Sequence, residues 1–73
     1  MLNEDMRDLA DKFIAETGVE IGRFYIEVTP YSEMLCFTNE DGREYDLPIS
    51  DESLADAVFS RLRELGVRVE EIK

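Results

Sequence analysis

The fold is decided by residues 34–47, which have the sequence MLCFTNEDGREYDL. Residues 39–42 (NEDG) fit a type I turn, because asparagine favours its first position and glycine adopts the left-handed conformation that makes a G1 bulge. This turn places two apolar cross-strand pairs on one face: Phe37 opposite Tyr45, and Leu35 opposite Leu47. Turn chemistry and hydrophobic alternation therefore predict the same hairpin independently.

An amphipathic helix is predicted on each side of this hairpin. The first covers residues 4–16, where apolar side chains recur at helical spacing, with Asn3 as the N-cap. The second begins with Ser50 as the N-cap and carries its apolar stripe through residues 54–65. A glycine supplies a left-handed end to each helix: Gly18 and Gly66.

A first strand is predicted within residues 19–29. Alternation at period two places three apolar side chains on one face: Phe24, Ile26 and Val28. Val19 and Ile21 fall on the opposite parity, so we expect a β-bulge at residues 22–23 to return them to the core. Residues 29–32 (TPYS) then predict a turn, with proline at its second position.

A short last strand is predicted from the alternation of valine and charged residues over residues 67–70. The helical crossover makes it parallel to the third strand, and crossover handedness places the second helix on the same face as the first. We therefore expect residues 1–73 to form a single acidic α+β domain. Its order is α-β-β-β-α-β, in two layers, with a mostly antiparallel sheet and two helices on one face.

The charge balance restricts the function. Eighteen acidic residues face eight basic ones and no histidine, for a formal net charge of −10. Such a chain repels nucleic acid and anionic membranes and suits a partner with a basic surface. Residues 1–5 (MLNED) have neither a basic region nor an apolar stretch, so we expect no secretory signal, no membrane association and a cytoplasmic protein.

Catalytic and metal chemistry are weakly represented. Without histidine, the commonest general base and zinc ligand is missing, and Cys36 is the only cysteine. It lies in the apolar run at residues 34–37, which predicts a reduced cysteine packed as a small hydrophobe. The four glycines are isolated, so no phosphate-binding loop is present. We expect no enzyme, no catalytic residue, no metal and no cofactor.

Acidic residues concentrate between residues 39 and 56. Seven carboxylates face Arg43 alone there, for a local net charge of −6. For any single residue, turn and N-cap chemistry or solubility is a sufficient explanation. The density of the set favours a binding face that imitates a row of phosphates. With the turn glycine, the candidate binding residues are Glu40, Asp41, Gly42, Glu44, Asp46, Asp51, Glu52 and Asp56.

Residues 35–62 resemble the small acidic anti-CRISPR proteins of phages. The closest likeness is to a type II-A inhibitor with a helix, a three-stranded antiparallel sheet and further helix. The likeness comprises an apolar strand, the NEDG turn followed by Glu44-Tyr45, and the helix start at residues 50–53. The resemblance implies an inhibitor whose acidic residues occupy the site where the RNA-guided nuclease reads duplex DNA. By analogy, Asp41, Gly42 and Glu44 match the hairpin tip that reaches into the nuclease.

The sequence thus predicts a non-enzymatic inhibitor or binding protein that presents a nucleic-acid-mimicking face to a basic groove of a larger protein, such as a CRISPR effector. It would bind no nucleic acid directly and be a monomer or homodimer. The alternative is a small accessory or structural subunit that docks through an apolar sheet face or strand edge. Its contact residues would be Met34, Cys36, Tyr25 and Tyr31. Salt dependence separates the two, because charge-driven binding weakens with salt and apolar docking hardly responds.

Overall fold

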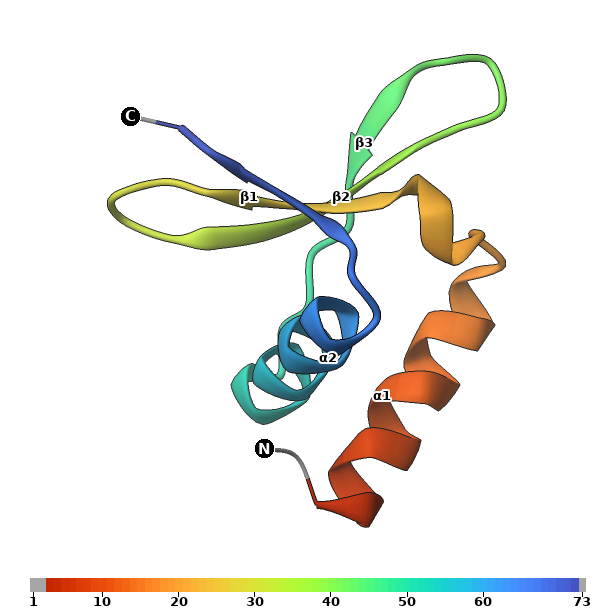
Figure 1. Ribbon diagram of the computed structural model, residues 1–73, viewed down its shortest axis with the longest axis vertical. Helices are drawn as coiled ribbons and strands as arrows, with labels where there is room; N and C mark the ends of the chain where they lie inside the picture. Colours follow the sequence, from red (N-terminus) through yellow and green to blue (C-terminus); the bar gives the residue numbers. More distant parts are fainter. Residues whose placement is uncertain (1–2, 73) are drawn as a thin grey trace.

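Two helices cover one face of a four-stranded sheet in the computed structural model, which describes residues 3–72 (Figure 1). The elements are α1 (Glu4–Thr17), a 3₁₀ turn η1 (Ile21–Arg23), β1 (Phe24–Val28), β2 (Glu33–Thr38), β3 (Glu44–Asp46), α2 (Glu52–Glu64) and β4 (Arg68–Glu71). The strand order is β3-β2-β1-β4, and all neighbours except β1 and β4 are antiparallel. The predicted two-layer α+β fold is confirmed.

Three residues at the chain ends, Met1, Leu2 and Lys73, lie outside the described residues. The expectations that rest on them, including part of the MLNED start, therefore stay predictions. Within residues 3–72, neither helix is long and apolar enough to cross a membrane.

The helix ends follow local capping chemistry. Asn3 caps α1 as predicted, since its side chain accepts a hydrogen bond from the backbone N–H of Met6 at 2.9 Å. The prediction of Ser50 as the N-cap of α2 is wrong by one residue. Asp51 is the cap, because its carboxylate accepts from the N–H of Leu54 at 3.1 Å and its backbone is still extended.

The C-terminal end of α2 is a Schellman motif built on Gly66. The N–H of Gly66 donates to the carbonyl of Arg63, and the N–H of Val67 donates to that of Leu62, both at 3.1 Å. Gly66 has a φ of 81°, in the left-handed region that favours glycine. This motif turns the chain back towards the sheet within two residues, and β4 begins at Arg68.

The core lies between the inner face of the sheet and both helices. The buried cluster contains Ala10 and Ile14 from α1, and Ala57, Val58 and Leu62 from α2. The sheet contributes Phe24, Ile26 and Leu35. Burial of each large aliphatic side chain stabilises the fold by about 1.5–3 kcal/mol, so this cluster is a major source of the hydrophobic driving force.

The predicted hairpin register is confirmed. Phe37 pairs with Tyr45, and their rings stack with centroids 5.5 Å apart. Leu35 accepts a hydrogen bond from the N–H of Leu47 at 2.8 Å, which makes the second predicted pair. Leu35, Phe37 and Leu47 pack on the core, whereas Tyr45 is 40% exposed near the hairpin end.

The predicted bulge at residues 22–23 is absent from the described chain. η1 occupies this position instead, and β1 begins at Phe24 and pairs regularly with β2. Val19 packs on the core from the loop before η1, whereas Ile21 is 39% exposed. A loop and a 3₁₀ turn can place Val19 without strand parity, so no bulge is needed to turn it inward.

The last strand forms and has the predicted direction. β4 runs parallel to β1, its hydrogen-bonded neighbour, and so in the same direction as β3. The crossover through α2 therefore carries the chain from one edge of the sheet to the other, past β2 and β1 (Figure 1). This connection puts α2 beneath the sheet beside α1, as predicted.

The first prediction concerns the turn that sets the hairpin register. Gly42 has a φ of 85°, and open space surrounds the position that a Cβ atom would take, so only backbone strain opposes a side chain there. We expect Gly42→Val to lower the free energy of unfolding by about 1–3 kcal/mol. Arg43→Val, the control, loses only an exposed ion pair with Asp41. Equal stability of the two variants in chemical denaturation would contradict the assigned turn.

Candidate functional site

The hairpin tip carries the first three candidate residues. Asp41 stabilises the turn, because its carboxylate accepts from the N–H of Arg43 at 3.1 Å and lies 3.6 Å from the Arg43 guanidinium. Gly42 supplies the left-handed turn position. Glu40 is exposed and forms no ion pair within residues 3–72. The tip therefore presents one uncompensated carboxylate.

Strand β3 carries the next two candidates on the face of the sheet that points away from the helices. Glu44 and Asp46 flank Tyr45, which points to the helix side with Phe37, so alternation turns both carboxylates outward. Both residues are exposed. Asp46 also lies beside Cys36, its cross-strand partner.

The start of α2 carries the last three candidates. Asp51 has a structural role as the N-cap. Glu52 lies in the first helical turn, where a negative charge is favoured by the helix dipole, and Asp56 follows one turn later. Glu52 and Asp56 are exposed, and neither forms an ion pair in the described part of the chain.

The structure does not join the candidate residues into one continuous face. Asn39 and Glu40 line a hollow of about 600 Å³ together with Leu65 and Gly66, at the C-terminal end of α2. The 13 residues of α2 span about 20 Å, so Asp51 and Glu52 lie far from the hairpin tip. Figure 1 shows the β2–β3 hairpin projecting away from the helices. The acidic set is thus divided between the tip, the outer face of β3 and the start of α2.

Every arginine within residues 3–72 is paired with a carboxylate. The pairs are Arg7–Glu64, Arg23–Glu20, Arg43–Asp41, Arg61–Asp11, Arg61–Glu64, Arg63–Glu33 and Arg68–Glu70. The shortest, Arg61–Asp11 at 2.8 Å, joins the two helices, and the Asp11 carboxylate raises the pKa of the Arg61 guanidinium. Exposed pairs contribute little stability, but here they determine which acids stay uncompensated.

We call six candidate residues the uncompensated acids: Glu40, Glu44, Asp46, Asp51, Glu52 and Asp56. None of them has an ion-pair partner among the described residues. A second group of unpaired carboxylates lies on α1: Glu4, Asp5, Asp8 and Glu16. Negative charge is therefore present on two sides of the molecule.

A groove lies between β2, the segment after β3, and α2. One part has a volume of about 430 Å³ and contains Met34, Leu47, Pro48, Ile49, Ala55 and Phe59. It continues into a second hollow of about 450 Å³, which shares Glu33, Ala55 and Phe59 with the first. Four carboxylates border these two hollows, which we call the β2–α2 groove: Glu33, Asp46, Glu52 and Asp56.

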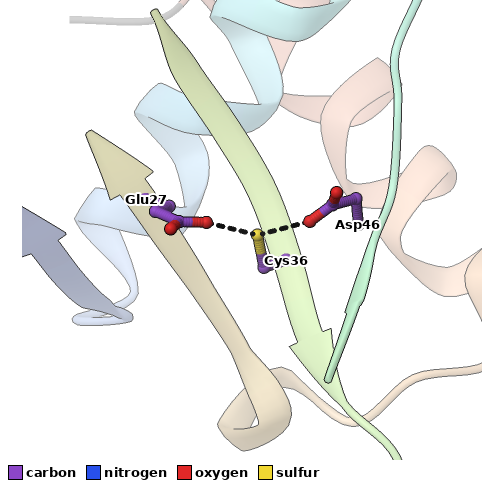
Figure 2. Close-up of side chains that lie close together, drawn as sticks. All are labelled: Glu27, Cys36 and Asp46. Atoms are coloured by element: carbon purple, nitrogen blue, oxygen red, sulfur yellow. Dashed lines mark hydrogen bonds between the residues drawn. The ribbon is translucent and has the colours of Figure 1, made fainter. Parts of the chain in front are cut away.

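Cys36 lies at the centre of the outer face of the sheet and is only 1% exposed. Its thiol lies between two carboxylates, with Sγ 3.5 Å from Glu27 Oε2 and 3.3 Å from Asp46 Oδ1 (Figure 2). Tyr25 is its other cross-strand neighbour, and the guanidinium of Arg68 covers the Tyr25 ring at 4.8 Å from the centroid. These flanking side chains bury Cys36 on the face of the sheet that no helix covers.

The thiol is buried and reduced, as predicted, but its surroundings are not apolar. Burial, and then hydrogen bonding to Asp46 and Glu27, raises the pKa of Cys36 from 9.0 to about 12. Burial and the neighbouring Cys36 and Glu44 raise the pKa of Tyr25 from 10.0 to about 12. At neutral pH the thiol is therefore a hydrogen-bond donor, and this environment opposes the thiolate that nucleophilic chemistry requires.

Within residues 3–72, one group of side chains has the spacing to hold a metal ion. Sγ of Cys36 and the carboxylate oxygens of Glu27 and Asp46 lie within 4.8 Å of one another. The single thiol proton is within reach of both carboxylates, at 3.3 Å from Asp46 and 3.5 Å from Glu27, and a metal would have to displace it. The sequence-based expectation of no bound metal stays a prediction.

The structure changes the contact set of the alternative docking hypothesis. Tyr25 and Cys36 are buried within the chain, at 5% and 1% exposure, so they do not offer an accessible contact surface. Tyr31 is exposed in the turn between β1 and β2, and Met34 lies in the β2–α2 groove. An apolar contact through this protein would therefore use the groove rather than the middle of the sheet.

Sequence reasoning did not identify Glu27 or Glu33 as site residues. The sequence does contain part of the information that places Glu27. Strand parity puts Glu27 on the outer face with Tyr25, and the NEDG turn puts Asp46 opposite Cys36 on that same face. Joining Glu27 to this pair requires the register between β1 and β2, which the TPYS turn sets. Glu33 has no such signal, since its position depends on where α2 packs.

No protein-family model, curated protein or solved structure matches this chain. The functional conclusions therefore depend on the residues and their geometry.

The second prediction concerns alkaline pH. The folded chain keeps the protons of Cys36 and Tyr25 to a higher pH than the unfolded chain does. Their contribution to the free energy of unfolding is therefore complete below about pH 9 and is lost as the pH rises towards about 12. We expect the free energy of unfolding to fall by up to about 1.4 kcal/mol per pH unit for each group in this window. Chemical denaturation measured by circular dichroism at several pH values would show this decline.

The matched variants are Cys36→Ser and Tyr25→Phe. Serine keeps a donor between Glu27 and Asp46, so we expect Cys36→Ser to retain most stability at pH 7 and to lose the steep decline that begins near pH 9. Tyr25→Phe should lose only the part of the decline in stability that begins near pH 10. An unchanged alkaline profile in Cys36→Ser would show that the thiol is not held in this environment.

Proposed function

We propose that this protein is a non-enzymatic inhibitor or binding protein whose acidic surface occupies a basic, nucleic-acid-binding groove of a larger protein. One observation carries the proposal. The arginines of the described chain are engaged internally, while six carboxylates between Glu40 and Asp56 have no basic partner. This distribution leaves negative charge available to a cationic partner.

The environment of Cys36 supports a binding role over a catalytic one. The strongest candidate nucleophile is buried and protonated at neutral pH, and the chain contains no histidine to activate it. Its flanking carboxylates, Asp46 and Glu27, share the single thiol proton as alternative acceptors and lie on the outer face of the sheet.

The resemblance of residues 35–62 to anti-CRISPR proteins makes the DNA-binding groove of a CRISPR effector the first partner to test. The tip hairpin extends away from the helices (Figure 1), so it could enter such a groove while the helices stay outside. Charge complementarity of this kind increases the rate of association and makes affinity strongly dependent on salt.

A second candidate function is that of an accessory subunit that docks through an apolar surface. The β2–α2 groove favours it, because its floor is apolar and its residues Leu47, Ile49 and Phe59 are only half-buried. The two candidates differ in how binding responds to salt: the charge-driven inhibitor weakens and the apolar subunit does not.

The third prediction tests the acidic surface with a guide-loaded type II-A CRISPR nuclease as the probe. We expect the chain to bind the nuclease and block DNA cleavage, with affinity falling roughly tenfold or more as NaCl rises from about 0.05 to 0.5 M. Combined reversal of Glu40, Glu44 and Glu52 to lysine should abolish binding and leave the circular dichroism spectrum unchanged. Single reversals should do little, because exposed charges contribute about 0–1 kcal/mol each.

The matched control reverses Asp5, Asp8 and Glu16, three unpaired carboxylates on α1. Asp11 is left intact, because it holds the two helices together through Arg61. Each triple variant replaces one acid in the first turn of a helix, Glu52 in α2 or Asp5 in α1. The loss of stability from the helix dipole is therefore similar in both variants. Loss of binding in the α1 variant alone would show that the wrong side was chosen, and salt-independent binding in all variants would favour the accessory subunit.

A further inference from the structure

We propose that the β2–α2 groove binds an extended basic segment of a partner protein, with apolar side chains of the segment on the groove floor and its lysines or arginines at the acidic rim. This inference rests on the proposed function and adds the place and chemistry of the contact. Three features of the groove support it: its floor, its rim and an open strand edge.

The floor of the groove is apolar and partly exposed. Leu47, Ile49 and Phe59 are only half-buried although they also pack on the core, and Ala55 lies beside them on α2. The hollow above them, of about 430 Å³, is large enough for one or two apolar side chains of a partner. Covering this floor would remove apolar surface from water and strengthen binding.

The rim selects the charge of the occupant. Glu33, Asp46, Glu52 and Asp56 border the two hollows, and the basic residue there, Arg63, is paired with Glu33 at 3.2 Å. Four carboxylates against one guanidinium leave a local net charge of −3. An acidic or neutral segment would leave these charges uncompensated, whereas lysine or arginine would pair with them.

The strand edge favours an extended occupant. β3 pairs with β2 only along Cys36–Thr38, and the last hydrogen bond on this side joins the Leu47 N–H to the Leu35 carbonyl. The chain then leaves the sheet through Pro48, which has no N–H. Alternate residues of β2 direct their N–H and carbonyl groups to the same side, so those of Glu33 point the same way as those of Leu35, towards the groove. Within residues 3–72 no backbone group bonds to them. An added strand can bond there.

The same features disfavour a second copy of this chain as the occupant. A two-fold interface through the groove would place the acidic rims of two copies near one another. Each copy carries a net charge of −10, so electrostatic repulsion opposes that contact. A basic partner meets no such penalty.

The fourth prediction uses two synthetic peptides of equal length and charge, one alternating arginine and leucine, the other alternating arginine and serine. Their affinities for the full chain are measured by fluorescence anisotropy at low and high salt. We expect the arginine–leucine peptide to bind about tenfold more tightly, because only it covers the groove floor. Ala55→Leu, which fills the groove, should abolish this difference.

Val69→Leu is the matched control, since it introduces the same side chain at a partly exposed apolar position (41%) on β4, at the other edge of the sheet. It should keep the full preference. Equal, salt-sensitive binding of both peptides would overturn the groove proposal and leave the charge-based function intact. Binding of neither peptide would overturn both. A homodimer that covers the groove and excludes the peptide, detected by sedimentation, would also overturn the groove proposal.

Discussion

The register of the β2–β3 hairpin is the constraint on which the rest of the structure depends. The NEDG turn fixes Phe37 opposite Tyr45, and this parity sends Leu35 into the core and Cys36 to the opposite face. The same register ends β3 at Asp46, which leaves the first half of β2 without a strand partner on that side. With β2 held in place by β1, a shift of one residue would reverse the faces of β3 and turn its acids towards the helices.

Charge is distributed by the same framework. The packing of helices and strands brings three arginines next to acids from other elements: Arg7 with Glu64, Arg61 with Asp11, and Arg63 with Glu33. These pairs neutralise much of the surface around the helix contacts but not the hairpin, the outer face of β3 or the start of α2. The strongly negative chain therefore has a patterned surface, and an acid-rimmed apolar groove lies where β3 ends and α2 begins.

The fold could be predicted because its determinants are local. Asn39 to Gly42 specify a turn, Asn3 specifies a cap, and alternation specifies strand faces, each within a few residues. The site was less predictable, because it depends on contacts between distant elements. Nothing local places Glu33 beside Arg63, or separates the hairpin tip from Asp51 by the length of α2. The cap shifted from Ser50 to Asp51 because both residue types suit that position, and Val19 reached the core through a loop that parity does not describe.

The central claim is that a basic partner binds the hairpin and groove side of the molecule rather than α1. Its most direct test is an amide chemical-shift titration of the ¹⁵N-labelled chain with the arginine–leucine peptide at low salt. We expect the largest shifts in residues 33–35, 47–49 and 52–59, with smaller ones at the tip. Shifts confined to residues 4–17 of α1, or to β4, would contradict the claim.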